Sequence, residues 1–282
     1  MTSNTCQHFV PQFYLRGWSD HAERVWQYPV TGAKPSHVRV KNIAFERGLY
    51  SHPAADKTAA LKTEKDLASI ESLYAPAWPG IIDRAQDSRT RRNLARFIAL
   101  TTLRHPQHQA AVQRVNANLR RAVKDIPSDQ TVEFHEANET FSCLAGDILN
   151  GTNDDKETIR STFLRSMHES VEDIAEALFR RRWGVIFSEH PAFVTSDCPV
   201  VLDRGACRKP ALGFGTAGTL VLFPFCPKRL LVIDDLWPHD FAHYKLTQAD
   251  VYNRFIAQGA VRFVYCSANE TGLAAKLGAW RK

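Results

Sequence analysis

A change in the spacing of apolar residues limits most strongly the folds that this chain can adopt. Between about residues 56 and 183, apolar residues recur at helical spacing, whereas the residues on either side form short alternating runs. Strands at both ends with helices between them predict an α+β fold with one mixed or antiparallel sheet, built from the N- and C-terminal parts. The central helical block, at about 56–183, should pack on that sheet.

Turn residues and proline place the boundaries of these elements. A first helix should end or kink near Pro76 and Pro79, and one late helix should interrupt the C-terminal strands. No linker rich in Pro, Gly or Ser lies near Trp183, so we expect one domain over residues 1–282; a division near Trp183 is the alternative. The expected helices are 56–78, 88–104, 107–124, 133–149, 155–183 and 247–258, and the expected strands are 24–30, 37–45, 184–188, 192–195, 199–202, 219–225, 230–233 and 261–266.

Composition excludes several classes of protein. The 282 residues are 44% hydrophobic, which is enough for a sizeable core, and no apolar run approaches the roughly 18 residues of a membrane helix. The first 18 residues lack the pattern of a signal peptide, so we expect a cytoplasmic protein. Six cysteines without a CxxC spacing predict neither a disulfide framework nor a structural zinc site.

Positive charge is concentrated between Arg84 and Lys124. This stretch holds ten basic residues and one acid, a charge of +9, and because the whole chain carries +6 the remainder sums to −3. Within it, Arg89, Arg92 and Arg96 form a row at helical spacing. The stretch is either a solvated helix surface or a binding surface for an anionic partner such as nucleic acid.

Several short strings carry a family resemblance. In this order they resemble the bacterial family called domain of unknown function 4238, over nearly the whole chain. The resemblance implies a single domain and brings no established activity. The strings are His8–Arg16 (HFVPQFYLR), Asn42–Glu46 with Tyr50, Glu71 with Ala75 and Pro76, Phe97–Leu100 before Arg104, Phe193–Val200 (FVTSDCPV), and Asn253 ahead of Ala260–Tyr265.

The first string predicts a helix entry with a polar face. Pro11 suits the first turn of a helix, and Gln12 and Arg16 are then neighbours one turn apart. His8 lies just before the helix and can fold back towards them. These three side chains form part of a pocket, or else hydrogen-bond to the strand that follows.

Glu71 and Arg104 fall on the buried faces of their helices. A buried charge is costly unless it is paired, so the two should pair with each other. The pair is either a structural clamp or a general base beside an anion-binding arginine. Asp197 lies between two strand runs, where it is either a catalytic carboxylate or the acceptor of nearby backbone N–H groups.

Two further patterns carry less information. Gly213–Gly218 fits GxGxxG, but a strand follows it where a dinucleotide site needs a helix, so we expect a loop. His105 and His108 have Pro106 between them and no third metal ligand nearby, which favours a polar helix start.

These observations predict a hydrolase or transferase that acts on a phosphate-containing substrate, with nucleic acid as the natural choice. Six polar candidates should gather in one cleft between the sheet and the helical block: His8, Gln12, Arg16, Glu71, Arg104 and Asp197. His8, Glu71 and Asp197 are the candidate catalytic residues. Glu71 or Asp197 would act as the base or bind a divalent metal ion. The alternatives are a non-catalytic module or sensor that binds nucleic acid or a nucleotide, and a protein-interaction role with no small-molecule site. The candidate substrate-binding residues are Gln12, Arg16, Arg104 and Asn253, and the candidate nucleic-acid contacts are Arg89, Arg92 and Arg96.

Overall fold

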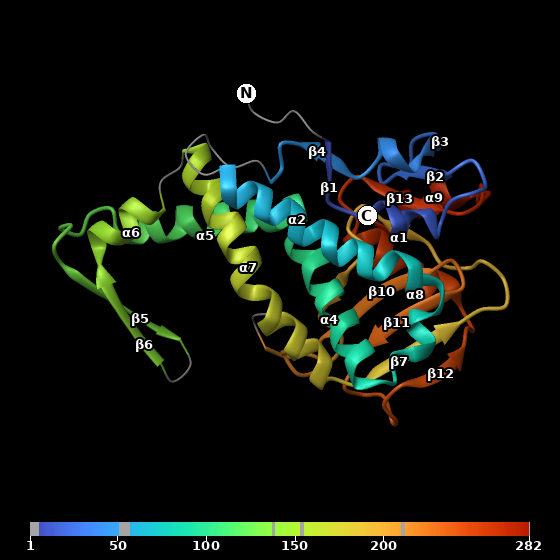
Figure 1. The fold of residues 1–282 in the computed structure, drawn as a ribbon. Helices are drawn as coiled ribbons and strands as arrows, with labels where there is room; N and C mark the ends of the chain where they lie inside the picture. Colours follow the sequence, from blue (N-terminus) through green and yellow to red (C-terminus); the bar gives the residue numbers. More distant parts are fainter. Residues whose placement is uncertain (1–5, 51–56, 137–138, 153–154, 210–211, 282) are drawn as a thin grey trace.

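The computed structural model describes residues 6–50, 57–136, 139–152, 155–209 and 212–281. Helices and strands are both abundant, so the α+β class is confirmed (Figure 1). The expectation of one sheet is wrong, because the strands divide among several sheets. The helices are α1 Gln12–Arg16, α2 Lys57–Tyr74, α3 Trp78–Ile81, α4 Ser88–Leu103, α5 Pro106–Val123, α6 Ala145–Gly151, α7 Lys156–Arg180, α8 Ala249–Gly259 and α9 Leu273–Trp280, with 3-10 turns η1 Val40–Asn42, η2 Ala75–Ala77 and η3 Ile82–Arg84.

The larger sheet comes from the C-terminal part of the chain. Its five strands have the order β12-β7-β11-β10-β9, and all pairs are antiparallel except β12 with β7. Aromatic contacts join this sheet to the helices: Trp78 stacks on Phe225 with ring centres 4.2 Å apart. The strands are β7 Trp183–Phe187, β9 Val201–Asp203, β10 Leu220–Cys226, β11 Arg229–Ile233 and β12 Ala242–Lys245.

A second sheet joins the two ends of the chain, as the pattern of strands predicted. Its order is β3-β2-β13-β8, so an N-terminal hairpin pairs with C-terminal strands. A separate short pair, β1 with β4, holds the segment before α1. The strands are β1 Cys6–His8, β2 Arg24–Pro29, β3 Ser36–Arg39, β4 Phe45–Arg47, β8 Thr195–Ser196 and β13 Phe263–Cys266.

The helix expected at 133–149 is wrong. The chain forms a hairpin, β5 Thr131–Glu136 and β6 Glu139–Leu144, and only then the short helix α6. Apolar residues alternate in both strands, with Val132 and Phe134 in one and Phe141 and Cys143 in the other, and this period of two outweighs the helical spacing. Sequence analysis also missed β1, β12 and α9, which are short.

The buried hydrophobic residues of both sheets and of most helices form one continuous cluster, from Phe9 to Leu277. Tyr14 lies at its centre, and its hydroxyl donates to the Pro224 carbonyl at 2.6 Å and lies 2.6 Å from Thr195 Oγ1. It thereby ties α1 to strands of both sheets. The one-domain expectation stays a prediction, which this continuity favours. Among the described helices, none is both long and apolar enough to cross a membrane.

His105 starts α5 and lies almost completely inside the core. Its Nδ1 accepts a hydrogen bond from the backbone N–H of Gln107 at 3.0 Å, and its ring meets Phe9 edge-on at 4.8 Å. Burial lowers the pKa of His105 to about 4, although the nearby Asp197 backbone carbonyl opposes this. The polar helix start that the sequence predicted is therefore confirmed, and His105 is neutral at neutral pH.

We expect His105 to make stability depend on pH. An unfolded histidine takes up a proton near pH 6.5 and the folded one near pH 4, so unfolding free energy falls as pH drops through this window, by up to about 3 kcal/mol. His105→Asn keeps a capping oxygen and removes the titration, so urea unfolding of this variant should lose less stability between pH 7 and 4. Exposed His21→Asn is the control. Equal losses in wild type and His105→Asn would contradict the assignment.

Candidate functional site

The first string of the sequence folds as a strand end followed by a one-turn helix. His8 ends β1, opposite Phe45 of β4, and α1 begins directly after Pro11. Arg16, one turn along, donates from Nη2 to Gln12 Oε1 at 3.3 Å and from Nε to Glu23 Oε1 at 3.0 Å. The one-turn neighbours predicted from the sequence therefore interact.

This arrangement fixes the tautomer of His8. A guanidinium can only donate, so Gln12 turns its oxygen to Arg16 and its Nε2 amide group to His8 Nδ1, 3.3 Å away. The Nδ1 atom must then be the acceptor, and the proton of the neutral ring lies on Nε2. Burial lowers the pKa of His8, and the positive charges of Arg104 and Arg16 lower it further. The backbone carbonyl of Lys41 acts in the opposite direction and raises the pKa. His8 is thus a neutral imidazole whose proton is on Nε2.

Arg104, which ends α4, is almost completely buried and is bonded on several sides. Its Nη1 donates to Glu71 Oε1 at 2.9 Å, and its Nη2 donates to the His8 carbonyl. Its own carbonyl accepts from the Tyr50 hydroxyl at 3.0 Å. Burial raises the pKa of Tyr50 to about 12, so this donor stays protonated. The predicted Glu71–Arg104 pair is confirmed.

The two partners of this pair differ in exposure. The side chain of Arg104 is 3% exposed and that of Glu71 is 31% exposed. Glu71 lies on a cavity of about 240 Å³, which His8, Gln12 and Arg104 also line. Only Oε1 of Glu71 has a hydrogen-bond partner among the residues that the structure describes. Arg104 is therefore buried and held by hydrogen bonds, whereas the carboxylate of Glu71 is accessible from the cavity.

Gln7 and Tyr50 are among the members of the cavity wall that were not predicted as site residues. Gln7 Oε1 accepts the backbone N–H of Tyr50 at 2.6 Å. The string that contains Tyr50 carried part of the family resemblance, which was the available signal. Nothing in the sequence marks Gln7, because its partner lies 43 residues away.

Asp197 does not join this site, so the expectation of one cleft holding all six polar candidates is wrong. Its carboxylate is 1% exposed and accepts three backbone N–H groups, from Val261 at 2.8 Å, Arg262 at 2.7 Å and Phe263 at 3.2 Å. Burial raises the pKa of Asp197, and these hydrogen bonds oppose that rise. Asp197 fastens the connection between α8 and β13, which matches the backbone-acceptor alternative.

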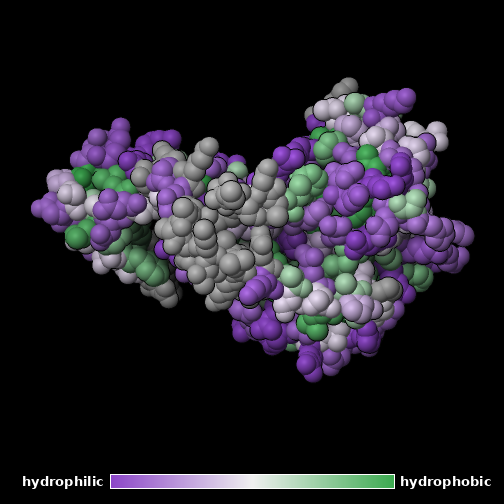
Figure 2. Space-filling view, turned by 45° about the horizontal axis from the view of Figure 1, so that its top comes forward, coloured by the Kyte–Doolittle hydropathy of each residue, from purple (hydrophilic) through white to green (hydrophobic). Residues whose placement is uncertain are grey.

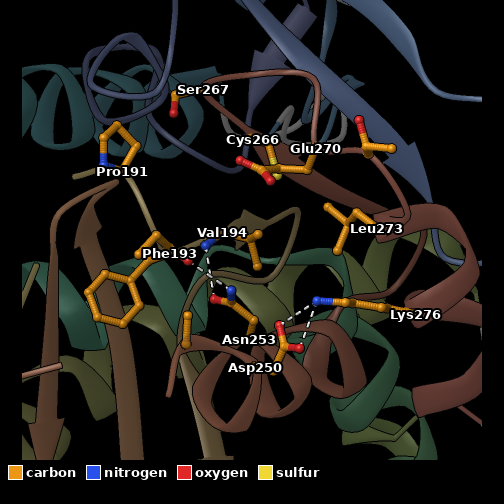
Figure 3. A pocket seen from close by; sticks show the side chains of 13 residues that line it. Pro191, Phe193, Val194, Asp250, Asn253, Cys266, Ser267, Glu270, Leu273 and Lys276 are labelled. Carbon is orange, nitrogen blue, oxygen red and sulfur yellow. Dashed lines mark hydrogen bonds and ion pairs between the residues drawn. The ribbon is translucent and has the colours of Figure 1, made fainter. Parts of the chain in front are cut away.

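Asn253 also lies elsewhere, in a second cavity of about 210 Å³ between residues 191–194, α8 and α9 (Figure 3). Its Oδ1 accepts the N–H of Val194 at 3.1 Å, and its Nδ2 donates to the Ala192 carbonyl at 2.9 Å. Nearby, Lys276 and Asp250 pair at 2.7 Å. Asn253 therefore holds a loop to α8 and is not brought near His8.

The arginine row on α4 is largely compensated by acids of α7. Arg92 pairs with Glu176, and Arg96 Nη2 lies 2.9 Å from Glu172 Oε2. Arg89 is exposed in the first turn of α4. Acids from the rest of the chain therefore account for much of the charge asymmetry, which weakens the case for nucleic acid on this helix.

Two sequence patterns remain, the glycine-rich string and the possible metal ligands. Residues 213–218 form turns that lead into strand β10, so the loop expected there is confirmed. Among the described residues, no three His, Cys, Asp or Glu side chains lie together in a way that could hold a metal ion.

Comparison with known proteins places the chain in a family. The family model described as "Protein of unknown function (DUF4238)" matches residues 6–270, so the chain belongs to that family and the resemblance seen in the sequence is confirmed. No curated protein and no solved structure matches it.

We expect Glu71 and Arg104 to be strongly coupled in stability. Removing one partner of a buried pair costs about 3–5 kcal/mol, because the other charge is stranded. Glu71→Ala and Arg104→Met should each lower the unfolding free energy in urea, and the double variant should lose less than the two losses combined.

The solvent-exposed pair Arg96–Glu172 is the matched control. Its coupling should stay below about 1 kcal/mol in the same experiment. Additive losses for Glu71 and Arg104, or coupling no larger than in the control, would contradict a buried pair.

Proposed function

We propose that this member of the DUF4238 family is a hydrolase or transferase whose reaction centre is the cavity at His8 and Glu71. Its substrate would be a small phosphate-containing molecule, because a cavity of about 240 Å³ holds a compact ligand. The proposal keeps the phosphate chemistry expected from the sequence and favours a small substrate over nucleic acid, since Arg92 and Arg96 are already paired.

The open side of the buried ion pair is the observation that carries this proposal. A carboxylate that stays partly exposed avoids the full desolvation cost of a buried pair, and it also remains within reach of a ligand. Here Arg104 is sealed and Glu71 stays accessible on a cavity. This supports a role for Glu71 towards a ligand.

Each residue has a distinct role in the proposed reaction. Glu71 would accept the proton of an attacking water or hydroxyl group, while Arg104 positions it through Oε1. His8 would border the bound phosphate as a neutral ring that Gln12 holds in place, because its Nε2 atom is buried away from solvent. The new P–O bond forms as the bond to the leaving oxygen breaks, and that oxygen takes a proton from solvent.

Arg16 supports the choice of an anionic substrate. Its guanidinium is 47% exposed, and its pair with Glu23 is solvent-exposed, so the pair contributes little and can exchange for a phosphate. Arg16 is linked to the cavity through Gln12, which places a cation next to the proposed site without closing it.

The test is turnover by a charge-neutral variant. Wild type would be incubated with phosphomonoesters, nucleotides and short RNA and DNA, with and without Mg²⁺. Glu71→Gln keeps an oxygen for Arg104 but loses its charge and its basicity, so the variant should be less stable than wild type, and kcat per folded molecule should fall at least ~100-fold. Glu172→Gln, on the exposed pair, should leave kcat unchanged.

The outcomes separate the two candidate functions. Full activity in Glu71→Gln would overturn the catalytic role. Binding of a nucleotide without turnover by wild type would favour the non-catalytic binding module, for which Glu71 and His8 are ligand contacts. Neither binding nor turnover of any tested compound would overturn both.

A further inference from the structure

Residues 106–151 project from the body of the molecule as an arm, made of α5, the hairpin β5–β6 and α6 (Figure 1). The arm has a small interior of its own, because buried Val123 and Ala145 do not belong to the main core cluster. The hairpin pairs with no further strand among the described residues, so both of its outer edges are open. An isolated two-stranded hairpin is marginally stable in water.

One face of this hairpin is apolar and partly uncovered. Directly opposed residues share a face of an antiparallel pair, which places Val132 with Cys143 and Phe134 with Phe141 on the same side. The side chain of Phe141 is 50% exposed. None of these four residues packs against the main core cluster.

Further apolar side chains are exposed on the same arm. Leu144 at the end of β6 is 42% exposed, and Val115 on α5 is 55% exposed. Figure 2 shows hydrophobic side chains gathered on this arm among hydrophilic ones. Such a surface is typical of a protein interface.

Charge on the arm is divided between two segments. Residues 106–124 hold four basic residues and no acid, whereas residues 125–151 hold six acids and no Lys or Arg. The arm as a whole therefore carries −2, which disfavours a nucleic acid as its partner. Its two halves are complementary in sign to each other, so the surface that best complements this arm is another copy of the same arm.

We propose that the arm is a dimerisation surface, on which a second copy of this chain docks around a two-fold axis. In such an interface the same patch is used twice, so the basic α5 of one protomer meets the acidic hairpin of its partner. The apolar residues around Phe141 fill the centre, where desolvated aromatic side chains give most of the affinity. This inference is independent of the reaction proposed for the cavity.

Sedimentation velocity over a range of concentrations tests the interface. Wild type should shift from monomer to dimer as concentration rises. Phe141→Thr keeps a residue suited to a strand and should weaken association at least about tenfold. Leu236→Thr is the matched control, since Leu236 is 70% exposed on the body, and it should dimerise as wild type does. A far-UV circular dichroism spectrum checks that each variant is folded.

Charge reversal tests the identity of the partner. Arg121→Glu with Lys124→Glu, and separately Glu136→Lys with Glu139→Lys, a directly opposed pair of the hairpin, should each weaken self-association. Mixing the two variants should restore dimers, because each contact then joins opposite charges. Three results would each overturn the proposal: wild type that stays monomeric at every concentration, Phe141→Thr that associates as tightly as wild type, or a mixture that does not recover dimers.

Discussion

The burial of one guanidinium, that of Arg104, organises the region that we identify as the site. A buried cation must be neutralised, and Arg104 is neutralised by the carboxylate of Glu71 and also donates to the carbonyl of His8. Its own carbonyl is held by Tyr50. One residue therefore connects α2, α4, β1 and the segment after β4.

This connection determines what the N-terminal segment can do. The His8 carbonyl is held by Arg104, and the His8 ring is held by Gln12, which Arg16 orients in turn. The imidazole is thus fixed in one tautomer beside a carboxylate whose second oxygen has no hydrogen-bond partner among the described residues. The site is formed by contacts between segments that lie up to 96 residues apart, and its chemistry depends on their staying together.

Sequence reasoning found those parts of the site that follow from local spacing. The helical phase of Glu71 and Arg104 indicated that both charges face inward, and pairing was the simplest way to bury them. The spacing of Gln12 and Arg16 likewise placed them on one helical face. Long-range partners could not be predicted: Asp197 binds backbone groups 64–66 residues later, and no pattern near Asp197 encodes them.

The hairpin β5–β6 shows why one part of the fold was missed. Its strands are short, and the apolar residues of the two strands, taken as one run with the start of α6, also fit a helical face. The spacing of apolar residues is the same whether the hydrophobic face they form is covered by a core or exposed to solvent. The sequence could therefore not show that this segment leaves the body of the molecule as an arm.

The central claim is that His8 is a neutral imidazole, protonated on Nε2, at a cavity that receives a phosphate-containing ligand. Side-chain ¹⁵N NMR of the histidines at pH 7 tests it most directly, with addition of inorganic phosphate and then of a nucleoside monophosphate. The account predicts the Nε2–H tautomer for His8 and a shift of its ring nitrogens when ligand is added. A protonated or Nδ1–H ring, or His8 signals that no ligand changes, would contradict it.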